Sequence, residues 1–180
     1  AYGSAALIGA AGILAAAIIV LTLFVKDVPP VVFSFRDYKT DMKKPDVLLL
    51  IAIIFVLGTH FGAEQTSISL LMKEVLFLKT ENIGMVFFIL GIWMTLLVPF
   101  AGRHLDKRDS VFVLLLAGLV ISSLFQIVTA FTQTFLGLVV VRMIHTAGDT
   151  LAILESDVLT ARFFPAARLG GSSGLLFFVR

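Results

Sequence analysis

The feature that most constrains this chain is a series of long stretches without a single Asp, Glu, Lys or Arg. Residues 82–102 form one stretch of 21 residues, and residues 110–141 form another of 32. A helix rises about 1.5 Å per residue, so about 20 apolar residues cross the hydrocarbon core of a bilayer. The stretches therefore predict membrane-spanning helices, and the longer one is long enough for two.

The composition supports lipid as the surrounding solvent. Hydrophobic residues make up 59% of the 180 residues and charged residues 14%, whereas soluble domains have about one half and one quarter. A soluble domain of this length could not bury so much apolar surface. The basic residues lie in short segments between apolar spans, so the net charge of +2 does not indicate nucleic-acid binding. The absence of Cys excludes disulfides and thiolate sites.

We therefore expect an all-α, polytopic transmembrane helix bundle. It divides into a first transmembrane helix at 1–25, a central loop at 26–46 and a bundle at 47–180. Within the bundle, the expected spans are 47–72, 83–101, 111–131, 135–157 and 172–180, of which the last is incomplete. The loop carries three Pro residues and a short surface helix around residues 37–44. With no Met and no basic stretch before its first apolar run, the chain reads as an internal piece without a signal peptide.

The distribution of Lys and Arg predicts the orientation of these spans. The segments 26–46, 102–110 and 162–171 hold ten basic residues, whereas 73–82 and 129–134 hold two. If each span crosses once, the first three segments lie on one side. The positive-inside rule places that side in the cytoplasm.

Titratable residues stand inside two of the expected spans, where a charge costs about 2.5–3.5 kcal/mol on insertion scales. In span 47–72, His60 and Glu64 lie four residues apart and share a helix face, next to Gln65. Their depth makes them candidates for function. The alternative is that Glu64 lies at the outer headgroups and His60 bonds a neighbouring carbonyl.

A second set lies in span 135–157. Arg142, His145 and Asp149 follow an i, i+3, i+7 spacing, which places them on one stripe of a helix near the middle of the span. They must face protein or a water-filled cavity. Such a set can carry a proton or clamp an anionic group. The alternative is a structural Arg142–Asp149 pair that fixes helix packing.

The charged segment GRHLDKRDS at 102–110 has more than a topological use. Gly102 allows a tight turn where a helix stops, and Asp106 can pair with a helix N-terminus or a basic side chain. The segment resembles the signature loop of the major facilitator superfamily, G-x-x-x-D-[RK]-x-G-[RK]-[RK]. Gly102, Asp106 and Lys107 are in register with it, whereas residues 109–111 depart from it.

Two further motifs are similar to patterns of that family. Residues 142–148, RMIHTAG, resemble its R-x-x-Q-G-x-G pattern, and residues 165–170, PAARLG, resemble its P-x-x-R-x-x loop. Their order implies a partial major-facilitator-type fold from helix six into helix eleven, with an N-terminal half elsewhere in the same polypeptide. A rival register takes 47–72 as helix one, but the helix and linker upstream favour the first.

The resemblance implies a multi-pass transporter of the cell (inner) membrane that moves a small solute by alternating access, with proton coupling as a hypothesis. The residues implied to line the substrate or proton site are His60, Glu64, Gln65, Arg142, His145 and Asp149. Those implied to form a cytoplasmic gate are Gly102, Arg103, Asp106 and Lys107, with Glu155 or Asp157 as partners.

The identity of the solute stays open. Arg142 favours acidic or zwitterionic solutes, but sugars and drugs are alternatives. No P-loop, H-E-x-x-H or G-x-S-x-G motif is present, so we expect neither an enzyme nor a cofactor. We expect no metal site either, because no third ligand is evident near His60 and Glu64. The alternative function is a membrane scaffold or receptor that keeps a transporter-like fold without transporting.

Overall fold

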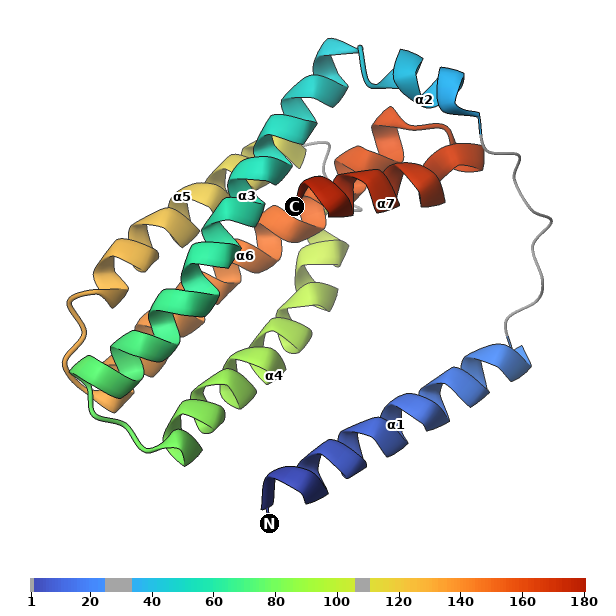
Figure 1. Ribbon diagram of the computed structural model, residues 1–180. Coiled ribbons are helices and arrows are strands. Elements are labelled where there is room, and N and C mark those ends of the chain that lie inside the picture. Colours follow the sequence, from blue (N-terminus) through green and yellow to red (C-terminus); the bar gives the residue numbers. More distant parts are fainter. Residues whose placement is uncertain (1, 25–33, 106–110) are drawn as a thin grey trace. The chain divides into compact units, whose positions relative to one another are not determined.

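The computed structural model describes residues 2–24, 34–105 and 111–180 of the chain (Figure 1). It divides into two compact units, Ala1–Val32 and Phe33–Arg180. The first unit contains helix α1 (Tyr2–Phe24), which has no acidic or basic residue in its terminal turns. Its described side chains are exposed.

All the regular secondary structure among the described residues of the second unit is helical. Its elements are α2 (Phe35–Asp41), α3 (Pro45–Leu70), the π-helical turn η1 (Leu71–Val75), α4 (Thr80–Leu105), α5 (Val111–Thr129), α6 (Phe135–Phe163), the 3₁₀ turn η2 (Ala166–Arg168) and α7 (Leu169–Val179). Four helical segments are long and apolar enough to cross a membrane, namely Pro45–Val75, Thr80–Arg103, Val111–Thr129 and Phe135–Phe163. For the described residues, they confirm the prediction of an all-α fold with helices long and apolar enough to span a membrane.

Local sequence signals place several helix ends. Pro45 occupies the first turn of α3, where its missing N–H costs no hydrogen bond. The Thr134 hydroxyl caps α6 by accepting a hydrogen bond of 3.1 Å from the backbone N–H of Gly137. Pro165 follows the end of α6, since it cannot continue the helix.

Other helix ends differ from the sequence prediction. Gly102 and Arg103 were expected in a loop, but α4 continues to Leu105 and includes both. Helix α6 continues to Phe163 rather than ending near Asp157, and α7 begins at Leu169 rather than at residue 172. Apolarity marks only the part of a helix at bilayer depth, whereas backbone hydrogen bonding continues into the polar region beyond it. The remainder of the charged segment, residues 106–110, lies outside the described residues.

Helix α6 is the centre of the second unit. It contacts α3, α4, α5 and α7. Half of the residues in its most apolar 18-residue stretch are buried, against 22% or less in the other three spanning segments. The most central helix therefore carries the predicted stripe of Arg142, His145 and Asp149, all of which are buried.

Two apolar cores lie along these helices. One includes Leu50 and Leu57 of α3 together with Leu115 of α5 and Leu159 of α6. The other contains Ile68, Met72, Val86, Leu90, Leu138 and Val139. Along both α3 and α6, the titratable residues at 60–64 and 142–149 fall between the two cores. Any charge there is separated from the ends of the helices by packed apolar side chains.

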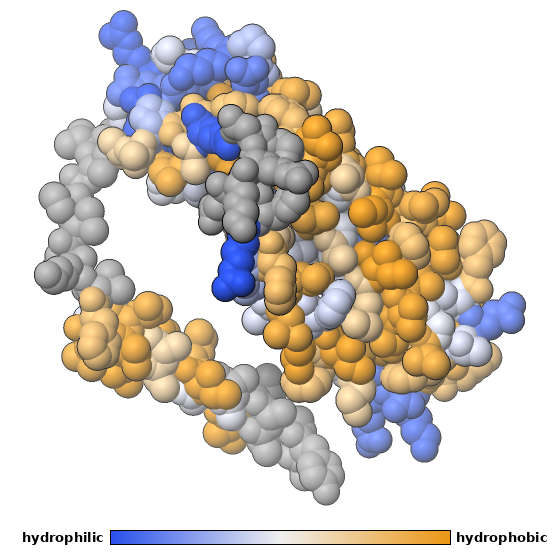
Figure 2. Space-filling view, turned by 180° about the vertical axis from the view of Figure 1, so that it is seen from behind, coloured by the Kyte–Doolittle hydropathy of each residue, from blue (hydrophilic) through white to orange (hydrophobic). Residues whose placement is uncertain are grey.

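The surface of the second unit is apolar along the helices and hydrophilic at their ends (Figure 2). Large exposed apolar side chains occur on every spanning helix, such as Phe55, Phe88, Val113 and Leu136. A surface of this kind suits contact with lipid or with further helices, since a soluble monomer rarely exposes so much contiguous apolar area.

An ionic contact ties α2 to the turn before α7. Arg168 Nη2 donates to Asp41 Oδ2 at 2.6 Å, and Lys44 Nζ lies 2.7 Å from Asp41 Oδ1. The Lys44 hydrogen bond holds the pKa of the Asp41 carboxyl below its usual value, with Arg168 acting in the same direction against the effect of burial. The described part of the 26–46 linker and the 162–171 segment thus lie at the same end of the helices.

Candidate functional site

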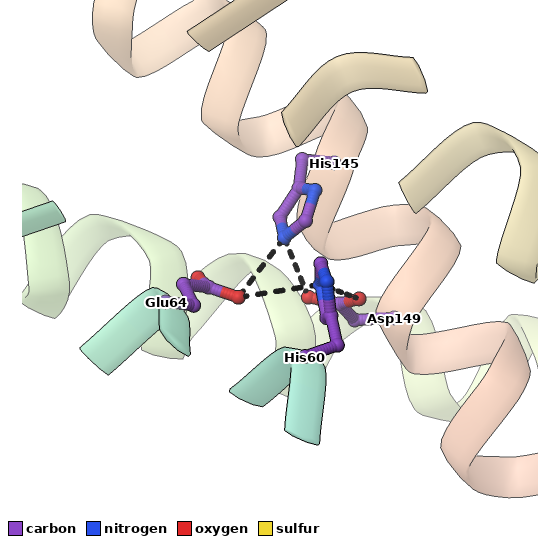
Figure 3. Close-up of side chains that lie close together, drawn as sticks. All are labelled: His60, Glu64, His145 and Asp149. Atoms are coloured by element: carbon purple, nitrogen blue, oxygen red, sulfur yellow. Dashed lines mark hydrogen bonds and ion pairs between the residues drawn. The ribbon is translucent and has the colours of Figure 1, made fainter. Parts of the chain in front are cut away.

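Four titratable side chains from two helices converge at one point. His60 and Glu64 come from α3, and His145 and Asp149 come from α6 (Figure 3). One ligand atom from each of the four lies within 4.8 Å of the others. We call these four residues the His–carboxylate cluster.

The distances in the cluster are short in every direction. His145 Nε2 lies 3.1 Å from Glu64 Oε2 and 2.9 Å from Asp149 Oδ2. His60 Nε2 lies 3.6 Å from Glu64 Oε2 and 3.7 Å from Asp149 Oδ1. Each helix supplies one imidazole and one carboxylate four residues further on, so the two pairs project from single faces of α3 and α6.

Arg142 joins the cluster from the α6 side. Its Nη2 pairs with Glu64 Oε1, which leaves Glu64 Oε2 turned toward the imidazoles. Its Nη1 donates a hydrogen bond of 2.8 Å to the side-chain oxygen of Gln126 on α5. Arg142 therefore links α3 to α6. The structural alternative, in which Arg142 pairs with Asp149 along its own helix, assumed a different partner.

Ser122 of α5 contacts three residues of the cluster. Its hydroxyl donates to Asp149 Oδ1 at 2.6 Å and lies 3.2 Å from His60 Nε2. Its backbone carbonyl accepts a hydrogen bond of 2.8 Å from His145 Nδ1. A carbonyl oxygen can only accept, so His145 must carry a proton on Nδ1.

This hydrogen bond fixes which nitrogen of a neutral His145 imidazole carries the proton. With the proton on Nδ1, a neutral imidazole turns the lone pair of Nε2 toward Glu64 and Asp149. That lone pair then lies 3.1 Å from Glu64 Oε2 and 2.9 Å from Asp149 Oδ2, both of which also carry lone pairs. With neutral imidazoles the charges of Glu64, Asp149 and Arg142 sum to −1, so the centre of the cluster favours a cation.

Two glycines bring α5 close enough to α6 for these contacts. A Cβ added at Gly148 would lie 2.6 Å from Ser122 N, and one added at Gly118 would lie 2.7 Å from Gly148 O. Both separations are shorter than ordinary van der Waals contact. Small residues allow membrane helices to approach in this way, and here the approach places Ser122 against His145 and Asp149.

The cluster is buried on the α6 side and partly accessible on the α3 side. The His145 side chain is fully buried, whereas the side chains of Glu64 and His60 are 14% and 20% exposed. A pocket of about 220 Å³ reaches the cluster between α3, α4 and α6. Its lining includes Glu64, Arg142 and Asp149, with Met94 on the α4 side. A small solute or ion therefore has a path to the carboxylates.

Gln65 stands apart from the other predicted site residues. Its side chain is exposed on α3 and lines a different pocket with Phe61 and Ile153. The structure thus brings together His60, Glu64, Arg142, His145 and Asp149 but leaves Gln65 outside the cluster.

The predicted gate is only partly within the described residues. Asp106 and Lys107 lie outside them, and Arg103 is exposed at the end of α4. Glu155 is fully buried in α6, and neither of its carboxylate oxygens has a hydrogen-bond partner among the described residues. Asp157 is exposed and lines a pocket with Ser156.

Three residues of the site were missed by the sequence analysis. Ser122 and Gln126 lie four apart on α5, and Trp93 Nε1 donates to the Met143 carbonyl at 2.8 Å, which ties α4 to α6. The available signal for Ser122 and Gln126 was their i, i+4 spacing, which places two polar side chains on one face of an uncharged span. The expectation that a third metal ligand is lacking was wrong, because α6 supplies two further ligand types beside His60 and Glu64.

Comparison of the chain with protein-family models, with curated proteins and with solved structures finds no match. The proposals for function therefore depend on the geometry of the site and on the motifs of the sequence.

Proposed function

We propose that this protein is a secondary transporter of the major facilitator type, which moves a small solute across the cell (inner) membrane by alternating access. The observation that carries the proposal is the His–carboxylate cluster with Arg142, which lies between the apolar cores of membrane-length helices. Ionisable groups at that depth are costly, and they mark solute or ion paths in membrane proteins.

Two features support a transport site over a purely structural network. The pocket of about 220 Å³ gives a solute access to Glu64 and Asp149, which a closed structural network would not need. The charges also come from separate helices, so relative motion of α3 and α6 changes the site. Alternating access requires a site of this kind, one that two arrangements of helices expose in turn.

The gate is proposed to consist of the charged segment at the end of α4 with Glu155. A fully buried carboxylate without a hydrogen-bond partner is costly, so a cationic partner for Glu155 is expected. The sequence offers Arg103, Lys107 and Arg108 for that role. Proton coupling stays a prediction from the sequence, and solute uptake driven by an imposed pH gradient tests it.

The natural absence of Cys gives a direct test of access to the site. Thr146 and Met94 line the pocket, and neither belongs to the His–carboxylate cluster. Thr146→Cys and Met94→Cys should react with a membrane-impermeant thiol reagent in inside-out vesicles and in right-side-out vesicles. The matched control is Leu124→Cys, at the depth of Ser122 but 53% exposed on the outside of α5, where lipid should block the reagent.

The outcomes separate the two functions considered. Reaction at Thr146→Cys and Met94→Cys from both sides, with an unreactive Leu124→Cys, supports alternating access. If both pocket positions fail to react from either side, the site is closed to water, and the protein is a non-transporting scaffold or receptor. Reaction from one side alone would also contradict alternating access.

A further inference from the structure

We propose that His60, Glu64, His145 and Asp149 bind a divalent transition-metal ion such as Zn²⁺, and that this ion is the transported solute. The second part rests on the proposed function, whereas the first part does not. Two imidazole nitrogens and two carboxylate oxygens are a common ligand set for Zn²⁺ and neighbouring first-row metals.

The spacing of the ligand atoms fits a tetrahedral ion. Metal–ligand bonds of about 2.0–2.1 Å in a tetrahedron place neighbouring ligand atoms about 3.3 Å apart. His145 Nε2 lies 3.1 Å from Glu64 Oε2 and 2.9 Å from Asp149 Oδ2, and His60 Nε2 lies 3.6 Å from Glu64 Oε2, so these three separations bracket that value. One ligand atom from each of the four residues lies within 4.8 Å of the others. The four groups thus need little movement to enclose an ion.

The surroundings orient two of the ligands in advance. The Ser122 carbonyl fixes His145 Nδ1 as the protonated nitrogen, so Nε2 is free to coordinate. Arg142 pairs with Glu64 Oε1 and leaves Oε2 for the ion. Such partners around the ligands usually set the affinity of a metal site as well as its geometry.

His60 is oriented less firmly than His145. The Ser122 hydroxyl donates to Asp149, so it can accept a hydrogen bond from a proton on His60 Nε2 at 3.2 Å. Coordination requires that proton to move to Nδ1. We therefore expect His145 to contribute more to metal affinity than His60.

A single proton is the competing occupant of the cluster. It would bring the charge of −1 to zero, but a proton bridges only one pair of atoms, whereas four groups converge here. The partial exposure of Glu64 and His60 and the adjoining pocket also allow an ion to enter and leave. This access favours an ion that exchanges with its surroundings over one that is permanently enclosed.

Binding can be measured on the purified protein in detergent with Co²⁺, followed by competition with Zn²⁺. Tetrahedral Co²⁺ absorbs visible light much more strongly than hydrated Co²⁺, so the spectrum reports the coordination directly. We expect one Co²⁺ per chain with tetrahedral absorption, displaced by Zn²⁺. Weak octahedral absorption or no binding to the unaltered protein would overturn the proposal without any variant.

Variants locate the ion. Asp149→Asn and His145→Gln keep the size of the side chain, and each should weaken Zn²⁺ binding by about 100-fold or more, since the loss of a ligand exceeds the effect of an outer partner. His60→Gln should weaken it less than His145→Gln. The control Glu74→Gln removes a largely exposed carboxylate from η1 and should leave binding unchanged. Equal loss in all four variants would place the ion elsewhere.

Uptake of ⁶⁵Zn²⁺ into proteoliposomes tests the second part. Accumulation that is lost in Asp149→Asn supports Zn²⁺ as the solute. Tetrahedral binding without uptake, combined with two-sided access of Thr146→Cys, refutes Zn²⁺ as the solute while leaving transport of another solute in place. Binding without uptake or two-sided access refutes the proposed function and leaves a metal-binding membrane protein.

Discussion

The close contact between α5 and α6 at Gly148 should make the protein sensitive to a larger side chain at this position. Gly148→Ala adds a Cβ that would meet Ser122 N at 2.6 Å and Gly118 O at 2.7 Å, both of them backbone atoms that cannot rotate away. Ordinary contact begins at 3.4 Å, so the helices must separate by about 0.8 Å at this point.

The separation has a calculable effect on the site. The hydrogen bond of 2.8 Å from His145 Nδ1 to the Ser122 carbonyl would lengthen toward about 3.6 Å, beyond hydrogen-bond distance. Strain from overpacking costs about 1–3 kcal/mol, and one weakened hydrogen bond adds about 1 kcal/mol. We therefore expect the free energy of unfolding to fall by about 2–4 kcal/mol.

Thermal unfolding in detergent, followed by the fluorescence of Trp93, measures this loss. At about 2–4 °C per kcal/mol, the Tm should fall by roughly 5–15 °C. The control is Gly84→Ala, which makes the same change on α4 where an added Cβ meets nothing within 4 Å. Its Tm should stay within about 2 °C. An unchanged Tm for Gly148→Ala, or an equal fall in Gly84→Ala, would refute the close approach of α5 and α6.

Three further predictions concern stability. Arg142→Met should lower the free energy of unfolding by about 3–5 kcal/mol, because it leaves the Glu64 carboxylate buried without its cationic partner. In a double-mutant cycle measured by denaturant unfolding, the added change Glu64→Gln should recover part of that loss, and purely additive effects would contradict the ion pair. Asp41 has a pKa in the native state below its unfolded value of 3.8, so its ionised carboxyl stabilises the fold above about pH 4, and this contribution is lost as the pH falls through the native pKa. The free energy of unfolding, measured against pH, should therefore show the advantage of the unaltered protein over Asp41→Asn shrinking below about pH 4. A constant difference would contradict this. Leu138→Ala should cost about 2–5 kcal/mol in thermal unfolding, whereas Leu136→Ala, 71% exposed on the same helix, should cost under about 1 kcal/mol; similar losses would contradict the placement of the second apolar core.

The fold could be predicted from the sequence as far as its signals are local. Predominantly apolar stretches of about 20 residues located the four membrane-length helices, because the thickness of a bilayer sets their length. The spacing of Arg142, His145 and Asp149 placed them on one helix face, because an α-helix repeats every 3.6 residues. The ends of α4 and α6 were missed because helical hydrogen bonding continues past the apolar part.

The relation between helices could not be predicted in the same way. His60 and His145 are 85 residues apart, and nothing in either span states which helix the other will face. Ser122 and Gln126 carry no charge, so the cost of burying a charge gave no reason to single them out. The pairing of Arg142 with Glu64 rather than with Asp149 likewise depends on how α3 packs against α6.

The division of the cluster between two helices has a consequence for how tightly it can hold a cation. Each helix contributes one nitrogen and one oxygen donor, so α3 alone or α6 alone offers only half of the coordination sphere. A separation of α3 from α6 by one or two ångströms would split a four-donor chelate into two two-donor halves. Affinity would then fall steeply with a small movement, and the distance between these helices would determine whether a bound ion is retained or released.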